Sequence, residues 1–395
     1  MMGDRSPNSA IGKILSYLPL GLSPPSMELR QFLADRALSE ILARAKPILG
    51  QDDGPNRPWS DWMSSVPDST RIVNMSIPGT HDSATWDYSQ DRQDELKKYT
   101  GNIPSAVFFH CQERSLVQSL NDGVRAFDLR VAYNPGNDTI GFWHGTALLG
   151  PTSTLQDILF GLYAWLLAHP TETVLVSINY EEGSKTVYDK KFEELLFATL
   201  NNDAGKKFWF MPAGKLGTLG QARGKLILLQ RFTYKFLDAS AMNPFGIHLG
   251  ADHWTANGGD IHLVYNEKPR RVAYIEDKFK PQVPPNSGAE TTISSKFDAV
   301  VSHLNRAIDG VPHQPDVEEG LYITFSSAFA DYESESPLTP NIIALGTKST
   351  SGMNERLHSW ISERKGVRFG VILMDFYHSE PNLVRGIITR NPGFS

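Results

Sequence analysis

A histidine and an aspartate stand next to each other in the segment IPGTHDSATW, residues 77–86, directly after an apolar run. Proline and glycine break the chain there, so His81 and Asp82 follow the end of a predicted strand. Imidazole titrates near neutral pH and can serve as a general acid or base. Polar residues are also common in ordinary tight turns. The pair therefore indicates chemistry only if other segments supply partners for it.

Further charged residues lie at the ends of other predicted strands. In GVRAFDLRV the side chains alternate between the two faces of a strand, so Asp128 and Arg130 share one face. A second histidine, His144, lies in the segment FWHGT. The other candidates at strand ends are Asn179, Glu181, Glu182, Arg231, Asp277 and Asp375. Because each buried charge needs a partner, charged groups at the same end of several strands indicate a site.

The composition of this set indicates phosphodiester cleavage. Two histidines can supply a base and an acid, and two arginines can hold phosphate oxygens in a fixed geometry. The alternative is metal-assisted hydrolysis, with calcium or magnesium bound by Asp82, Asp128, Glu181 and Glu182. The positive charge of Arg130 opposes a cation at the same place. Since no CxxC, HExxH, EF-hand or Walker-type pattern occurs, we expect neither a metal nor another cofactor.

Short β-branched runs alternate with helical patterns from residue 71 onward. The predicted strands are 71–77, 124–131, 140–143, 174–180, 226–232, 272–275, 321–325 and 367–374. The clearest predicted helix follows the cap candidate Thr154, and other helical patterns cover 187–200, 293–308 and 353–361. This alternation predicts the α/β class, with an irregular (β/α) TIM barrel over residues 57–395. We treat residues 233–271 as one long loop over a face of the barrel.

Residues 1–56 form a predicted N-terminal helical extension. Apolar residues recur at helical spacing over 11–18. A second helix, with Ser26 as its cap, is expected to end before Pro47. We expect this pair of helices to close the bottom of the barrel. A role at a membrane surface is the less favoured interpretation, because the polar faces mix acids and bases.

The bulk composition argues against several classes of partner. The chain of 395 residues has a net charge of −6 at pH 7, so no basic field attracts nucleic acid. Its single cysteine, Cys111, excludes an intrachain disulfide, and no apolar run approaches the roughly 18 residues of a membrane span. These features favour a cytoplasmic or peripheral-membrane location and leave secretion open. We also expect a monomer.

The long loop is a candidate for contact with a lipid bilayer. It carries Phe245, His248, His253 and Trp254 near the expected mouth of the barrel, and tryptophan suits the membrane interface. The alternative is a loop that merely folds back on the barrel.

The order of the motifs resembles bacterial-type phosphatidylinositol-specific phospholipase C, the X-domain fold. The segments that carry this resemblance are RIVNMSIPGTHDSATW, GVRAFDLRV, FWHGT, HPTETVLVSINYE, ARGKLILLQRF, EDKF, LYITFSSA and GVILMDFY. They lie within about residues 57–390. The resemblance implies a distorted TIM barrel that cleaves a phosphatidylinositol-like phospholipid to diacylglycerol and a cyclic inositol phosphate.

The resemblance also implies catalytic roles. His81 would take the proton from the inositol 2-hydroxyl, and His144 would protonate the departing diacylglycerol oxygen. Asp375 would pair with His81, while Asp82 would link His144 to Arg130. Arg130 would take the place that calcium holds in the animal enzymes.

Substrate binding is implied for Asp128, Asn179, Glu181, Arg231, Asp277 and Phe279. Within this set, Arg231 and Asp277 would hold inositol hydroxyls. Two positions depart from the family's pattern, because Asn179 or Tyr180 replaces a lysine and Phe279 replaces a tyrosine that stacks on inositol. These departures predict a weaker preference for plain phosphatidylinositol.

Two other hypotheses stay open. One is a related barrel phosphodiesterase of the glycerophosphodiesterase or phospholipase D type, which gathers more acidic metal ligands at its mouth. The other is a lipid-binding module without turnover, which the presence of both histidines disfavours.

Overall fold

The computed structural model describes residues 26–52, 54, 58–238, 245–285, 287–310, 317–330 and 337–394. Its strands are β1 Ser76–Thr80, β2 Ala126–Tyr133, β3 Ile140–His144, β4 Ala147–Leu148, β5 Thr173–Tyr180, β6 Lys225–Arg231, β7 Ile247–His248, β8 Ile261–Glu267, β9 Arg270–Glu276, β10 Val317–Phe325, β11 Gly346–Thr347, β12 Thr350–Ser351 and β13 Gly370–Met374. The main sheet has the order β7-β6-β5-β2-β1-β13-β10-β9-β8. Its pairs from β7 to β9 are parallel, and β8 joins β9 antiparallel.

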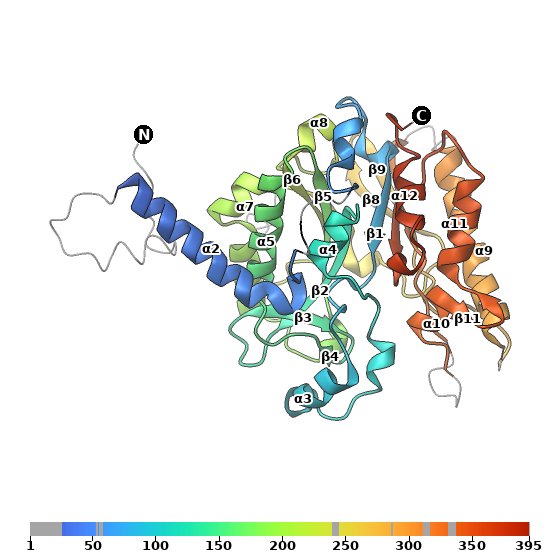
Figure 1. Cartoon of the computed structure of the whole chain (residues 1–395), viewed down its shortest axis with the longest axis horizontal. Coiled ribbons are helices and arrows are strands. Elements are labelled where there is room, and N and C mark those ends of the chain that lie inside the picture. The colour runs from blue at the N-terminus through green and yellow to red at the C-terminus, as the bar shows by residue number, and fades with distance from the viewer. Residues whose placement is uncertain are drawn as a thin grey trace.

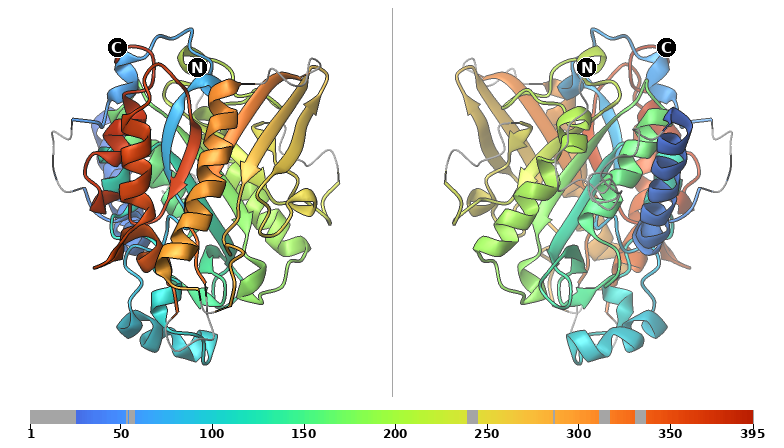
Figure 2. Two further views of the ribbon diagram at one scale, coloured as in Figure 1. Left: turned by 90° about the vertical axis from the view of Figure 1, so that its right-hand side faces the viewer. Right: turned by 90° about the vertical axis from the view of Figure 1, so that its left-hand side faces the viewer.

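Helices cover the outside of this nearly closed barrel (Figures 1 and 2). They are α2 Met27–Leu49, α3 Gln90–Thr100, α4 Leu116–Asn121, α5 Leu155–Ala168, α6 Lys190–Leu200, α7 Asp203–Phe208, α8 Leu219–Ala222, α9 Ala289–Asp309, α10 Pro340–Leu345, α11 Met353–Ser362 and α12 Leu383–Ile388. The predicted start of α5 is confirmed, because the Thr154 side chain accepts a hydrogen bond from the Asp157 backbone N–H at 3.1 Å. Within the described ranges, none of these helices combines the length and apolar character that a membrane span needs.

The first strand lies further along the chain than the sequence predicts. Residues Ile72–Asn74 form a 3-10 turn, and β1 begins only at Ser76. The sequence predicts that Pro78 and Gly79 end the strand, but both residues lie inside β1. A Cβ atom on Gly79 would lie 2.9 Å from both the Cβ and the backbone oxygen of Ala126, so glycine is required where β1 packs this closely on β2. Because β1 runs on to Thr80, His81 follows directly from its C-terminal end.

Two further predictions are corrected by the sheet. Strand β3 pairs antiparallel with β2 and extends it as a hairpin, so it is not one of the parallel barrel strands. An apolar run has the same pattern in either direction, which is why the sequence did not show this. The loop predicted at 233–271 contains β7 and β8, which form the two edges of the main sheet.

The N-terminal helix packs on the side of the barrel rather than closing its bottom. In Figure 1, α2 lies along α5 and its N-terminal half projects away from the body. Ile48 and Leu49 are buried, and Arg44 pairs with Asp157 of α5 at 2.9 Å. The helix continues through Pro47 to Leu49, because the burial of these last two residues offsets one lost backbone hydrogen bond. The predicted helix at 11–18 lies outside the described residues.

Candidate active site

Most of the predicted site residues line one cavity of about 560 Å³. They are His81, Arg130, His144, Asn179, Glu181, Arg231, Asp277, Phe279 and Asp375. They come from the C-terminal ends of the parallel strands and from the β3 hairpin, where barrel enzymes carry their chemistry. Asp82 and Asp128 are buried beneath the cavity and do not line it.

His81 is held between a carboxylate and a guanidinium group. Its Nδ1 lies 2.9 Å from Asp375 Oδ1, and its Nε2 lies 2.7 Å from Arg130 Nη2. A guanidinium can only donate, so Nε2 accepts and the ring proton sits on Nδ1, where it is donated to Asp375. Burial lowers the pKa of His81, but Asp375 and then Asp82 outweigh burial and raise that pKa above its ordinary value. His81 is therefore oriented as a base whose Nε2 lone pair faces the guanidinium of Arg130, and both residues line the cavity.

Asp82 connects the two histidines with the arginine. Its Oδ2 lies 3.1 Å from His144 Nε2 and 3.2 Å from His81 Nε2, while its Oδ1 lies 3.2 Å from Arg130 Nε. These contacts are close, although the hydrogen-bond geometry at Oδ2 is poor. Burial raises the pKa of Asp82 to about 6. The link from His144 to Arg130 that the resemblance implies is thus present as a chain of contacts.

His144 has an acceptor on each side of its ring. Its Nδ1 lies 2.9 Å from the Phe109 carbonyl oxygen, which can only accept, and its Nε2 faces Asp82. Burial, and then the charge of Arg130, lowers the pKa of His144 to about 4. Asp82 and His144 are in direct contact, so their protons are gained and lost by the pair rather than by either residue. Because His144 lines the cavity, a proton of this pair can be given to a leaving group there.

Asp128 holds the two arginines of the site. Its Oδ2 lies 3.2 Å from Arg130 Nε, and its Oδ1 lies 3.2 Å from Arg231 Nη1. Burial acts against the charged form, but Arg130 and Arg231 lower the pKa of Asp128 to about 2. Because Asp128 lies under the arginines, its contacts support an orienting role rather than the substrate contact that the resemblance implies.

The strand register places Asn179 at the inward-facing position. Asn179 of β5 pairs with Arg130 of β2 on one side and with Arg231 of β6 on the other. Residues at matched positions of neighbouring strands share a face. The Tyr180 hydroxyl instead donates to the Thr186 carbonyl at 2.7 Å. Asn179 and Tyr180 are the two residues considered for the position where the family has a lysine. Of these two, Asn179 lies between Arg130 and Arg231.

Trp254 belongs to the wall of the cavity. The Arg231 guanidinium lies 3.7 Å from the centre of its ring, and its indole N–H donates to Asp277 Oδ2 at 2.8 Å. The sequence makes Phe245 a candidate for bilayer contact, but its side chain is buried and cannot make that contact. The parts of the segment that carry Phe245 and Trp254 pack on the barrel, as the alternative interpretation of the sequence expects. There Trp254 holds Arg231 and Asp277 in place.

Several residues at the site carry no signal in the sequence. Phe329 stacks on Phe279 with ring centroids 6.1 Å apart and planes inclined by 19°. Gln112 donates from Nε2 to the His81 carbonyl at 2.7 Å and to the Met374 carbonyl at 2.8 Å, which ties the ends of β1 and β13 together. Cys111 is buried beside them, and burial, then Asp375 and Asp82, raises the pKa of its thiol well above the ordinary value. None of these positions ends a predicted strand, so no sequence pattern marked them.

Curated proteins with similar sequences are phosphodiesterases and X-domain proteins. No protein-family model matches the chain. It is 31% identical over 215 residues to the 1-phosphatidylinositol phosphodiesterase of Listeria monocytogenes, a match that covers 52% of this chain and 61% of that protein. It is 28% identical over 239 residues to PI-PLC X domain-containing protein 1 of Danio rerio, covering 56% of this chain and 71% of that protein. The matched region thus spans about three fifths of the Listeria protein.

Solved structures show the same architecture. A phosphatidylinositol-specific phospholipase C of Staphylococcus aureus superposes with a TM-score of 0.64 at 20% identity, covering 84% of this chain and 97% of that chain. The Listeria monocytogenes enzyme superposes with a TM-score of 0.55 at 23% identity, covering 84% and 98%. The chain has the fold of these bacterial phospholipases. The predicted irregular TIM barrel is thereby confirmed.

Proposed function

We propose that the chain is a phosphodiesterase of the phosphatidylinositol-specific phospholipase C type that works without a metal ion. One observation carries this proposal: a continuous chain of contacts runs from Asp375 through His81, Arg130 and Asp82 to His144. It combines an oriented base, a fixed cation and an acid around one cavity, which are the groups that phosphodiester cleavage requires. The names of the relatives at 31% and 28% identity support the same reaction class.

The first step forms a cyclic phosphate. His81 Nε2 takes the proton of the inositol 2-hydroxyl, whose oxygen forms a bond to phosphorus. Asp375, on Nδ1, stabilises the imidazolium that results. The guanidinium of Arg130, which contacts Nε2 in the free site, binds a non-bridging phosphate oxygen as negative charge develops there.

The leaving group departs on the side of His144. The bond from phosphorus to the diacylglycerol oxygen breaks, and the proton held by His144 and Asp82 goes to that oxygen. The two imidazole rings lie with centroids 6.1 Å apart at 88°, so they can flank one phosphorus. This spacing suits an in-line displacement, in which the base and the acid act on opposite sides.

Arg130 fills the position that a cation would otherwise need. Asp82 and Asp128 each lie 3.2 Å from its Nε, and Glu181 lies 3.7 Å from its Nη1. Despite burial, these carboxylates raise the pKa of Arg130 well above its ordinary value, so it stays charged. A divalent ion on the same carboxylates would have to displace a paired guanidinium, which is the reason we infer a metal-independent reaction.

The remaining walls of the cavity suit a polyol headgroup. Asn179, Arg231 and Asp277 offer hydrogen-bond donors and acceptors, and the stacked rings of Phe279 and Phe329 offer an aromatic surface. A cyclic polyol has both hydroxyls and apolar C–H faces, so it can use both walls. We therefore propose an inositol-like headgroup.

The reaction is tested with phosphatidylinositol vesicles in excess EDTA, and phosphorus NMR follows the products. We expect cleavage at an unchanged rate and a cyclic inositol phosphate as the first product. Loss of activity in EDTA that calcium restores would refute the metal-independent proposal. Absence of any cleavage of an inositol lipid would refute the reaction class.

Membrane contact is proposed for the rim of the cavity. Val107, Val187 and Phe236 are exposed, and each neighbours in sequence a residue that lines the cavity. We expect Phe236→Ser to weaken binding to phosphatidylinositol vesicles and to leave cleavage of a soluble inositol phosphodiester unchanged. Leu167→Ser is the matched control, because Leu167 is equally apolar and exposed but lies near the C-terminal end of α5, at the opposite end of the barrel. Equal vesicle binding by the two variants would contradict this placement.

A further inference from the structure

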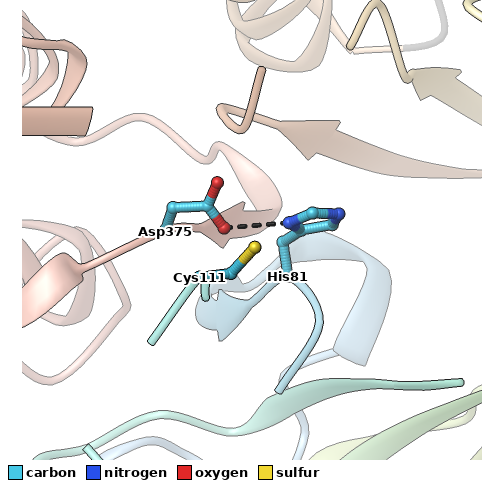
Figure 3. A group of neighbouring side chains, drawn as sticks. All are labelled: His81, Cys111 and Asp375. Carbon is cyan, nitrogen blue, oxygen red and sulfur yellow. Dashed lines mark hydrogen bonds and ion pairs between the residues drawn. The ribbon is translucent and has the colours of Figure 1, made fainter. Parts of the chain in front are cut away.

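A cysteine that the proposed mechanism does not use lies next to two residues that line the cavity, His81 and Asp375. Cys111 is fully buried, and its Sγ lies with ligand atoms of His81 and Asp375 in a group whose members are all within 4.8 Å of one another (Figure 3). A second, independent observation is the other oxygen of the same carboxylate. Asp375 Oδ2 is buried and receives no hydrogen bond from any residue in the described ranges. An unpartnered buried oxygen is costly, and a bound cation would satisfy it.

We propose that His81, Cys111 and Asp375 form an inhibitory site for a thiophilic divalent cation such as Zn²⁺. Imidazole, thiolate and carboxylate are the three ligand types that zinc takes in proteins, and the cavity leaves a fourth position open. At tetrahedral angles, two zinc–ligand bonds of about 2.0–2.3 Å hold their ligand atoms about 3.5 Å apart. Atoms of the group that lie up to 4.8 Å apart therefore have to approach by up to about 1.3 Å when the metal binds. On binding, the thiol releases its proton to solvent and the thiolate takes the metal.

The charges around His81 favour its Nδ1 edge for the metal. That edge faces Asp375 and Cys111, whereas the Nε2 edge faces the guanidinium of Arg130. Asp82, Cys111 and His144 form a second close group. Asp82, however, lies 3.2 Å from Arg130 Nε, whose positive charge opposes a cation there. The geometry therefore points to the group that contains Asp375.

A metal at this position would stop the proposed reaction, and this step rests on the proposed function. When the metal occupies Nδ1, the proton of the neutral ring moves to Nε2. Asp82 Oδ2, 3.2 Å away, can accept a hydrogen bond from it, while the guanidinium of Arg130, which can only donate, has to move away. The lone pair that takes the substrate proton is then lost, and Asp375 is drawn from the imidazole to the metal. Mg²⁺ and Ca²⁺ prefer oxygen ligands and bind a thiolate poorly, so they should not have this effect.

Metal binding is measured on the full chain with Cd²⁺, whose bond to a thiolate gives an ultraviolet charge-transfer band. Cys111 is the single cysteine, so the band reports this residue alone. We expect the band to saturate at one equivalent in the wild type and to be absent in Cys111→Ser. In Asp375→Asn the band should remain, with affinity at least about tenfold weaker, since loss of even an outer-shell partner costs 10–100-fold. A wild-type chain without the band would overturn the site.

Inhibition is measured with Zn²⁺ on a soluble inositol phosphodiester, which avoids binding of zinc to lipid phosphates. We expect inhibition that EDTA reverses, and at least a roughly tenfold higher inhibitory concentration for Cys111→Ser and Cys111→Ala. The inhibition of each variant is measured relative to its own rate without zinc. Two variants are used so that a folding defect in one leaves the test intact. Equal inhibition of the wild type and both variants, or equal inhibition by Mg²⁺, would overturn the proposal. A Cd²⁺ band in a protein that has no phosphodiesterase activity would refute the proposed function and support the metal site.

Discussion

Replacing Arg130 by alanine tests the central feature of the proposed mechanism. Its guanidinium contacts His81 Nε2 at 2.7 Å and lies 3.2 Å from Asp82 and from Asp128. Removing one preorganised donor of this kind costs roughly 10²–10³ in turnover, equivalent to about 2.7–4 kcal/mol of transition-state stabilisation. We expect the turnover of Arg130→Ala to be reduced by a factor in that range. The turnover of Arg130→Lys should lie between those of Arg130→Ala and the wild type. The single ammonium nitrogen of lysine keeps the charge but cannot bind both carboxylates and the phosphate.

The assay compares kcat and kcat/KM on a soluble inositol phosphodiester in the presence of EDTA. Arg36→Ala is the matched control, because Arg36 is an exposed arginine on α2 whose pair with Glu40 also lies at the surface. Thermal unfolding of each variant separates lost chemistry from lost structure, since Arg130→Ala leaves two buried carboxylates with one partner fewer. A turnover of Arg130→Ala within tenfold of the wild type would refute the role of the guanidinium.

Two further predictions concern the acid–base pair and the headgroup. His81→Ala and His144→Ala should each nearly abolish cleavage with the fold intact, and the double variant should be little worse, because groups that act as one unit are not additive. The pH–rate profile should be bell-shaped: activity is lost at low pH as His81, whose pKa is raised, binds a proton, and at high pH as Asp82 and His144 lose theirs. Substantial activity of either single variant, or a flat profile, would contradict the two-histidine mechanism. Asn179→Lys and Phe279→Tyr should increase the preference for phosphatidylinositol, measured on a panel of lipids at equal surface density. The expected gain is roughly 0.5–1.5 kcal/mol for a restored neutral hydrogen bond. A wild type that already strongly prefers phosphatidylinositol would show that these two positions do not set selectivity.

Local patterns in the sequence were enough to find the polar residues that face the cavity. Alternation within β2 places Asp128 and Arg130 on one face, and the apolar runs of β1 and β13 are followed directly by His81 and Asp375. These assignments need only the period of a strand and the rule that parallel strands share an end. They do not depend on where the strands pair, which is why shifted strand boundaries did not disturb them.

What the sequence did not show depends on contacts between distant segments. Trp254 has the chemistry of a membrane-interface residue, and only the folding of β7 and β8 onto the sheet edges puts it against Arg231. The direction of β3 is likewise set by its pairing with β2. Cys111 lies in an irregular segment with no periodicity, so nothing in its neighbourhood predicted that its thiol would lie between two catalytic groups.

The bond between His81 and Asp375 is held by two strained turns. Asp82, directly after His81, has a φ of 40°, and Phe376, directly after Asp375, has a φ of 44°. Each such conformation costs on the order of 1–3 kcal/mol in a residue other than glycine, so the surroundings must impose it.

Buried polar side chains and backbone bonds supply that constraint. Asn354 of α11 donates from Nδ2 to the carbonyls of Asp375 and Phe376 at 2.9 and 3.0 Å, and the Phe376 N–H donates to the Cys111 carbonyl at 2.9 Å. On the other side, the Asp82 carbonyl accepts from the Thr85 hydroxyl at 2.9 Å. The side chain of Asn354 on α11 and the backbone at Cys111 therefore position the pair of His81 and Asp375. His81 is thus oriented by contacts that lie outside the strand ends, and this is why strand-end residues alone describe the composition of the site but not its geometry.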